Sequence, residues 1–65
     1  MKILLNGEAF ATDAKTLDEL CARLGFADAK IATAVNGNVV AAVVRSATQL
    51  APADEVEIVA PRQGG

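Results

Sequence analysis

A single helical pattern lies between two groups of strand-forming residues, and this order restricts the possible folds more than any other feature of the chain. Four apolar residues have the spacing i, i+3, i+4 and i+7 of one helix face: Leu17, Leu20, Cys21 and Leu24. Thr16 and Glu19 form a capping box, in which the Thr16 hydroxyl accepts from the Glu19 amide while the Glu19 carboxylate reaches back. Gly25 stands where a left-handed residue would end the helix, so that Phe26 can fold back onto the same face.

Short apolar runs on both sides of this helix predict strands. The runs are Lys2–Leu5, Glu8–Thr12, Ile31–Val35, Val39–Val44 and Val56–Val59. Asn6-Gly7 is a strong signal for a two-residue hairpin turn, and residues 36–38 form a second turn signal. The run from Ala41 to Val44 has no clean period, and Ser46–Leu50 is expected to form a turn or a single helical turn.

Strands before and after one helix, with the last strand returning to the first, predict a single mixed sheet. The expected fold is an α+β β-grasp, with four to five strands and the helix across one face. Residues 1–60 form its body, and residues 61–65 form a flexible C-terminal tail. Pro61 supports this boundary because it has no amide donor with which to continue a strand.

Composition excludes several classes of function. The chain has 6 basic and 8 acidic residues, a net charge of −2, and no histidine. The basic residues are scattered singly and only two residues are aromatic, so a nucleic-acid partner is not expected. No apolar run is long enough for a membrane span. One cysteine cannot form an internal disulfide, which favours a cytoplasmic location.

The residues that most resemble a reactive or metal-binding site have simpler structural explanations. Cys21 lies on the apolar helix face with no base near it in sequence, so we expect it to pack as a small hydrophobic residue. Asp54, Glu55 and Glu57 lack a chelating spacing, and we expect them to be solvated charges. The sequence therefore predicts no metal site and no bound cofactor.

The tail carries the candidate functional group. From Pro61 onwards the tail extends about 17 Å at full stretch. Gly64 and Gly65 have no Cβ, so they can thread a narrow channel that a side chain would block. The reactive group at its tip is the α-carboxylate of Gly65, which is a poor electrophile until another protein activates it. These features predict a substrate or carrier for partner enzymes and not an enzyme.

The whole chain resembles the sulfur carrier proteins of thiamine biosynthesis, a small ubiquitin-like β-grasp family. The matching segments are residues 1–8, Thr16–Leu20, Ala34–Gly37, Asp54–Val59 and Gln63–Gly65. One departure is Ala53, where the family usually has glycine before the aspartate. This departure concerns the conformation of a loop.

The resemblance implies a reaction cycle that the partners carry out. An E1-like adenylyltransferase would use ATP and magnesium to adenylate Gly65. Sulfur from a persulfide, supplied by a cysteine desulfurase, would then convert Gly65 to a thiocarboxylate, which donates its sulfur to thiazole synthase. Arg62, Gln63 and Gly64 would be recognised as part of the tail.

Strand alternation divides the apolar residues between the two faces of the sheet. Four are expected to lie in the core: Ile3, Leu5, Val56 and Ile58. Leu4 and Val59 would then lie on the open face, beside the exit of the tail. We expect them to form an apolar surface for partners.

Three other functions fit the same features. The sulfur-carrying small subunit of molybdopterin synthase has the same fold and tail, but those chains are usually longer and carry an insertion. A ubiquitin-like modifier would be conjugated through the same terminal glycine. A non-catalytic interaction domain would use neither glycine.

Overall fold

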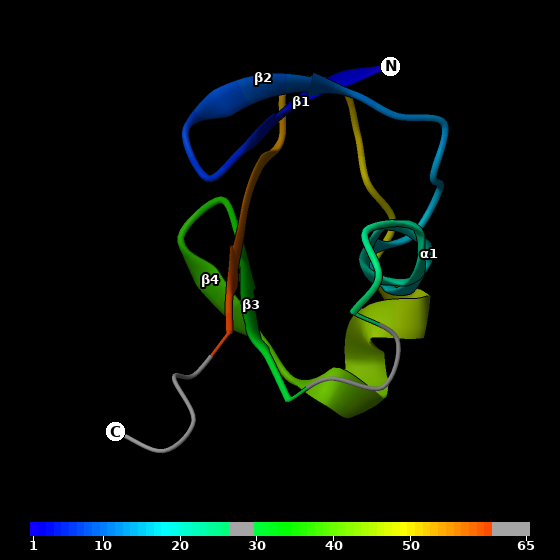
Figure 1. The fold of residues 1–65 in the computed structure, drawn as a ribbon, viewed down its shortest axis with the longest axis vertical. Coiled ribbons are helices and arrows are strands. Elements are labelled where there is room, and N and C mark those ends of the chain that lie inside the picture. Colours follow the sequence, from blue (N-terminus) through cyan, green and yellow to red (C-terminus); the bar gives the residue numbers. More distant parts are fainter. Residues whose placement is uncertain (27–29, 61–65) are drawn as a thin grey trace.

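Five strands form one sheet, and both helical segments lie on the same side of it (Figure 1). The computed structural model of the chain describes residues 1–26 and 30–60. In chain order the elements are β1 (Lys2–Leu5), β2 (Glu8–Ala11), α1 (Leu17–Arg23), β3 (Ala32–Val35), β4 (Asn38–Val40), the 3₁₀ helix η1 (Ala42–Ala47) and β5 (Glu55–Val59). Neither α1 nor η1, the helices of this described part, has the length and apolar character that crossing a membrane requires.

The last strand lies in the middle of the sheet. The strand order is β2-β1-β5-β3-β4, so β5 separates the two hairpins. It runs parallel to β1, with Leu5 opposite Val56, and antiparallel to β3, with Val35 opposite the same residue. The expected mixed sheet, in which the last strand returns to the first, is confirmed, and the chain has the α+β β-grasp fold.

Each hairpin turns at an Asn-Gly pair, as the sequence predicts. The φ angles are 50° and 85° at Asn6 and Gly7, and 52° and 83° at Asn36 and Gly37. Positive φ at both central residues is the type I′ geometry, whose twist matches that of the flanking strands. Asn38, which the sequence placed in the second turn, instead begins β4.

Helix α1 begins and ends at the predicted capping residues. Thr16 is its N-cap, and its Oγ1 accepts a hydrogen bond of 3.2 Å from the Glu19 amide. The Glu19 carboxylate reaches back one residue further than the capping box requires, to the Lys15 amide. At the other end, Gly25 has a φ of +89° and Phe26 donates 2.8 Å to the carbonyl of Cys21. The Gly25 amide donates 3.1 Å to the carbonyl of Ala22, and the two bonds form a Schellman motif, which satisfies carbonyls at the end of the helix.

The run from Val39 to Val44 is wrong as a single strand. Strand β4 ends at Val40, and the chain then forms η1, whose Val43 side chain is 88% exposed. Arg45 explains this path, because its guanidinium donates to the Thr33 hydroxyl (3.0 Å) and to the carbonyl of Ile31 (2.8 Å). These bonds tie η1 to β3 instead of leaving it to lengthen the edge of the sheet.

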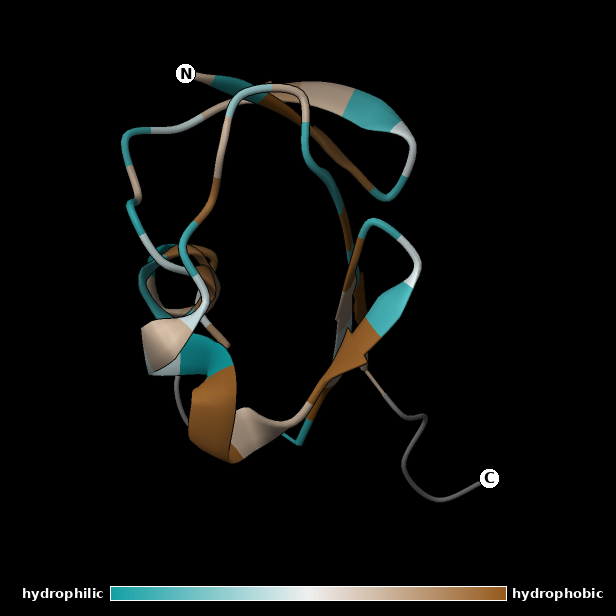
Figure 2. Cartoon of the chain, turned by 180° about the vertical axis from the view of Figure 1, so that it is seen from behind, coloured by the Kyte–Doolittle hydropathy of each residue, from teal (hydrophilic) through white to brown (hydrophobic). Residues whose placement is uncertain are grey.

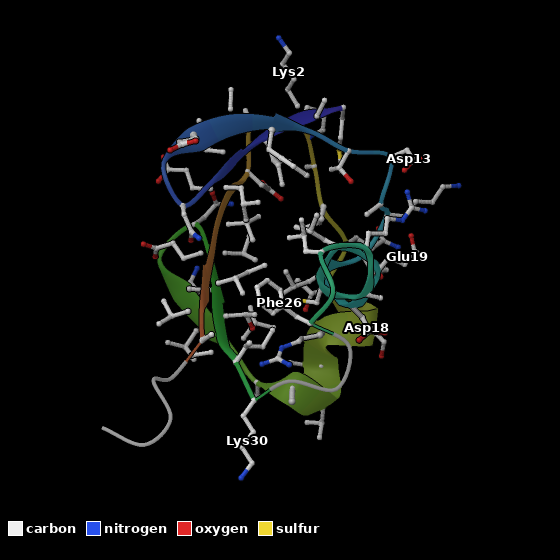
Figure 3. The ribbon with its side chains drawn as sticks, in the orientation of Figure 1. Lys2, Asp13, Asp18, Glu19, Phe26 and Lys30 are labelled. Carbon is white, nitrogen blue, oxygen red and sulfur yellow. The ribbon has the colours of Figure 1, made fainter. Side chains whose placement is uncertain are left out.

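The core fills the space between the sheet and the helical layer. Its buried apolar residues are Ile3, Ala14, Leu17, Leu20, Cys21, Leu50, Val56 and Ile58. Leu5 is partly buried against this cluster, so the core side predicted for β1 and β5 is confirmed. Phe26 points from the end of α1 toward the sheet, while Lys2 and Lys30 point away from the body (Figure 3). Apolar residues accordingly concentrate in the strands and in both helices (Figure 2).

Candidate functional site

Strand β5 leads directly into the segment that the sequence marks as functional. It ends at Val59, and Ala60 is the last residue that the structure describes before the tail. The predicted tail, residues 61–65, lies outside the described residues, and with it the predicted site residues Arg62, Gln63, Gly64 and Gly65. Among the described residues, the site consists of strand β5, which precedes the tail, and the surface around this strand.

Asn6, in the first turn, is hydrogen-bonded to β5 on the side of β1. Its side-chain Oδ1 accepts 3.0 Å from the Ile58 amide, and its Nδ2 donates 3.2 Å to the Ile58 carbonyl. The Asn6 amide also donates 2.9 Å to the carbonyl of Val56. The side chain of Asn6 thus continues the hydrogen bonding between β1 and β5 beyond the last paired residues, toward the tail.

Asn36, in the second turn, is hydrogen-bonded to β5 on the side of β3. Asn36 donates its backbone amide to the Glu55 carbonyl (2.7 Å), and its Oδ1 accepts from the Glu55 amide (2.9 Å). Its Nδ2 donates 3.0 Å to Oδ1 of Asp54, whose other oxygen accepts 2.8 Å from the Ala51 amide. The two Asn-Gly turns therefore fix β5 near both of its ends.

Sequence reasoning missed this second role of the asparagines. It identified Asn6 and Asn36 only as parts of two turn signals. The asparagine side chain also carries a donor group (NH₂) and an acceptor group (C=O), which can pair with a backbone carbonyl and a backbone amide. The repetition of the Asn-Gly pair, once in each hairpin flanking the last strand, was the available signal.

The outer face of β5 alternates with the core face as predicted. Val56 and Ile58 are buried, whereas Glu55, Glu57 and Val59 are exposed. Leu4 is 37% exposed and Val59 is 61% exposed, so the predicted exposure of both side chains on the open face is confirmed.

Leu4 and Val59 do not lie together beside the exit of the tail, and this part of the prediction is wrong. Leu4 pairs with Glu55, at the start of β5, whereas Val59 is its last residue. Four strand residues span about 13 Å. Because β5 runs parallel to β1, only Val59 lies next to the tail, and the outward side chains of Glu55 and Glu57 separate it from Leu4.

Val59 instead shares a shallow hollow with β3 and β4. The hollow has a volume of about 160 Å³ and is lined by Ala32, Thr33, Ala34, Val39, Glu57 and Val59. Val39 is 86% exposed, and sequence reasoning did not identify it as part of this surface. The apolar area nearest the tail therefore extends toward β4, with the alanines of β3 as its floor.

The loop before β5 contains Ala53, the departure from the family pattern noted above. Ala53 adopts a φ of 71°, a left-handed conformation that glycine adopts without steric cost. Its amide donates 2.8 Å to the carbonyl of Lys2, so the loop is joined to β1. The loop therefore keeps a glycine-like conformation even though alanine occupies the position.

Cys21 does not contribute to the site. The thiol is buried in the core, and burial raises its pKa, with the nearby Arg45 charge opposing the shift and Asp18 adding to it. A neutral buried thiol is a poor nucleophile, and the expected packing role is confirmed. Within residues 1–26 and 30–60, no three His, Cys, Asp or Glu side chains gather closely enough to hold a metal ion.

Comparison with known proteins agrees with this architecture. A crystal structure described as thiamine biosynthesis protein (ThiS) from Geobacter metallireducens is 28% identical, covers 100% of both chains and has a TM-score of 0.83. A search of curated protein sequences finds no match to this chain. The sequence model of the ThiS family matches residues 3–65. The match extends over the body and the tail, and the chain therefore belongs to the ThiS family.

Proposed function

We propose that the chain is a sulfur carrier in thiamine biosynthesis, in which the carboxylate of Gly65 is adenylated, converted to a thiocarboxylate and used as the sulfur donor for thiazole formation. The activating protein would be an E1-like adenylyltransferase that uses ATP and magnesium. The sulfur would come from the persulfide of a cysteine desulfurase, and thiazole synthase would accept it. The carrier itself would be a substrate of these enzymes and would bind no cofactor.

The observation that best supports this proposal is the position of β5. This strand is hydrogen-bonded to a neighbouring strand on each side and is gripped by Asn6 and Asn36. It leads directly to the Gly64-Gly65 sequence, which the family match includes. Cys21 is buried in the core. A strand that is hydrogen-bonded on both sides, followed by two residues without side chains, suits presentation of a carboxylate to the active site of another protein.

The open face would supply the contacts that hold the partners during this presentation. Val59 and the hollow beside it lie next to the start of the tail, and Leu4 lies further along the same face. An exposed apolar area of this kind is typical of an interaction surface. Arg62, Gln63 and Gly64 would contact the channel of the activating enzyme.

The proposal is tested by loading the carrier in vitro. Incubation with the activating enzyme, ATP, magnesium and a persulfide donor should replace one oxygen of the Gly65 carboxylate by sulfur. Tandem mass spectrometry should locate the change on residue 65, and the Cys21→Ser protein should load equally well. Sulfur on Cys21 with Gly65 unmodified would refute the proposal, as would a natural reading frame that continues beyond residue 65.

A single methyl group tests whether the enzyme depends on the slenderness of the tail. Gly64→Ala should leave the free energy of unfolding within about 0.5 kcal/mol of the wild-type value. In a narrow channel the methyl group would displace the carboxylate, and a displacement of about 1 Å can reduce the rate about 100-fold. Pyrophosphate exchange measures this loss. Wild-type exchange by the variant would argue against recognition of the Gly-Gly sequence.

A further inference from the structure

Each hairpin turn contains a chemically labile sequence, because asparagine is followed by glycine. The backbone nitrogen of the glycine, once deprotonated, can attack Cγ of the asparagine, since glycine has no Cβ to obstruct the approach. The new N–Cγ bond closes a succinimide ring while the Cγ–Nδ2 bond breaks and ammonia leaves with a proton from water. A further water molecule opens the ring at one of its two carbonyls, giving aspartate or isoaspartate.

Both turns are open to this reaction. Asn6, Gly7, Asn36 and Gly37 are all exposed. A Cβ placed on Gly7 or Gly37 would meet no atom within 4 Å, so space around the glycines does not prevent the ring from forming. The difference between the turns comes from what holds each asparagine amide.

The amide of Asn6 is held by the interior of the sheet. Both of its hydrogen bonds go to the backbone of Ile58, a residue of the central strand that is 6% exposed, and both bonds are partly buried. For Asn6 to react, its amide must break away from a backbone that cannot move without opening the sheet.

The amide of Asn36 is held at the surface. Its two hydrogen bonds, to the Asp54 carboxylate and to the Glu55 amide, are exposed. One partner is a side chain on the loop before β5, and the other is the first residue of that strand. Exposed bonds at the end of an element open more readily than bonds in the middle of a sheet.

We propose that Asn36 is a site of spontaneous deamidation in the folded protein, faster than Asn6, and that the product weakens the attachment of the β3–β4 turn to β5 and to the loop before it. Deamidation exchanges the Nδ2 donor, which lies 3.0 Å from Asp54 Oδ1, for a carboxylate oxygen. Two carboxylates then face each other where a hydrogen bond stood. Isoaspartate adds one backbone carbon to the turn, which no longer fits the type I′ geometry.

Ageing of the folded protein in mildly alkaline buffer tests the difference between the two sites. Peptide mapping should show acid in place of amide at Asn36 several-fold faster than at Asn6. In urea, where the hydrogen bonds are absent, the two sites should react at similar rates, both faster than in the folded protein. Equal rates in the folded protein, or faster conversion of Asn6, would overturn the proposal.

Two variants test the part of the proposal that concerns Asp54. Asp54→Ala removes one partner of the Asn36 amide and should raise the rate at Asn36 several-fold without changing the rate at Asn6. An unchanged rate at Asn36 would overturn the idea that this bond restrains the reaction.

Asn36→Asp mimics one product of deamidation. This variant should lower the Tm by about 4–8 °C, the shift that loss of one ordinary hydrogen bond gives a domain of this size. The same charge change at the exposed Asn38 of β4 is the matched control. A Tm equal to that of the control would contradict the predicted weakening.

Discussion

The side chains on the two faces of the central strand β5 have different roles. On the covered face, Val56 and Ile58 belong to the same buried core as the helix residues Leu17 and Leu20. On the open face, Glu55, Glu57 and Val59 are exposed. An alternation of one residue therefore separates the side chains that stabilise the domain from those available to partners, and the energetic cost of substitution should differ between the faces.

Truncation of a core leucine should have the largest effect. Leu20 is fully buried, so Leu20→Ala should cost about 2–5 kcal/mol, which approaches the whole stability of a domain this small, roughly 3–5 kcal/mol. The matched control is Leu4→Ala on the open face, which should cost less than about 1 kcal/mol. Urea unfolding measures both. Similar costs would break the proposed division between the faces.

A position on neither face should give the next largest effect. Ala53 has a positive φ, which disfavours a side chain, so Ala53→Gly should stabilise the protein by up to about 1 kcal/mol. The greater freedom of glycine in the unfolded chain offsets part of this gain. Ala51→Gly, in the same loop, is the control and should not stabilise. A lower Tm for Ala53→Gly would contradict the inferred strain.

A charge on the open face should separate binding from stability. Leu4→Glu should change the free energy of unfolding by no more than about 0.5 kcal/mol, because the side chain contributes little to the core. It should nevertheless weaken binding to the activating enzyme, which calorimetry measures. Unfolding of this variant would show that Leu4 belongs to the core, and unchanged affinity would remove it from the partner surface.

The smallest effect concerns the buried thiol. Burial raises the pKa of Cys21 above its ordinary value of 9.0, so the unfolded chain releases the proton at lower pH than the folded chain. The resulting contribution to stability is fully present below about pH 9 and is lost as the pH rises through the folded-state pKa. Urea unfolding of the wild type and Cys21→Ala between neutral pH and about pH 10 measures this loss. The stability difference between the two proteins should shrink as the pH rises, and a constant difference would contradict it.

Sequence patterns predict most of this architecture because its signals are local. The helix caps and both type I′ turns depend on residues within a few positions of each other, and alternation assigns Val56 and Ile58 to the core. The segment from Ala42 to Ala47 has valines that favour a strand, and its helical path depends on bonds from Arg45 to β3 that no local pattern reveals. The hollow next to Val59 was missed for the same reason, because strand order brings Val39 close to it.

The central place of β5 also constrains how the protein can be made. Strand β1 is synthesised early, yet one of its two neighbours in the sheet is separated from it by about fifty residues of chain. Such long-range pairing is slow to form and cannot begin until residues 55–59 have left the ribosome. Until then Ile3 and Leu5 lack the β5 residues Val56 and Ile58 beside them in the core, and β1 and β3 each have an unpaired strand edge. The nascent chain is therefore most prone to aggregation just before its last strand emerges, and a chain truncated before β5 should not fold.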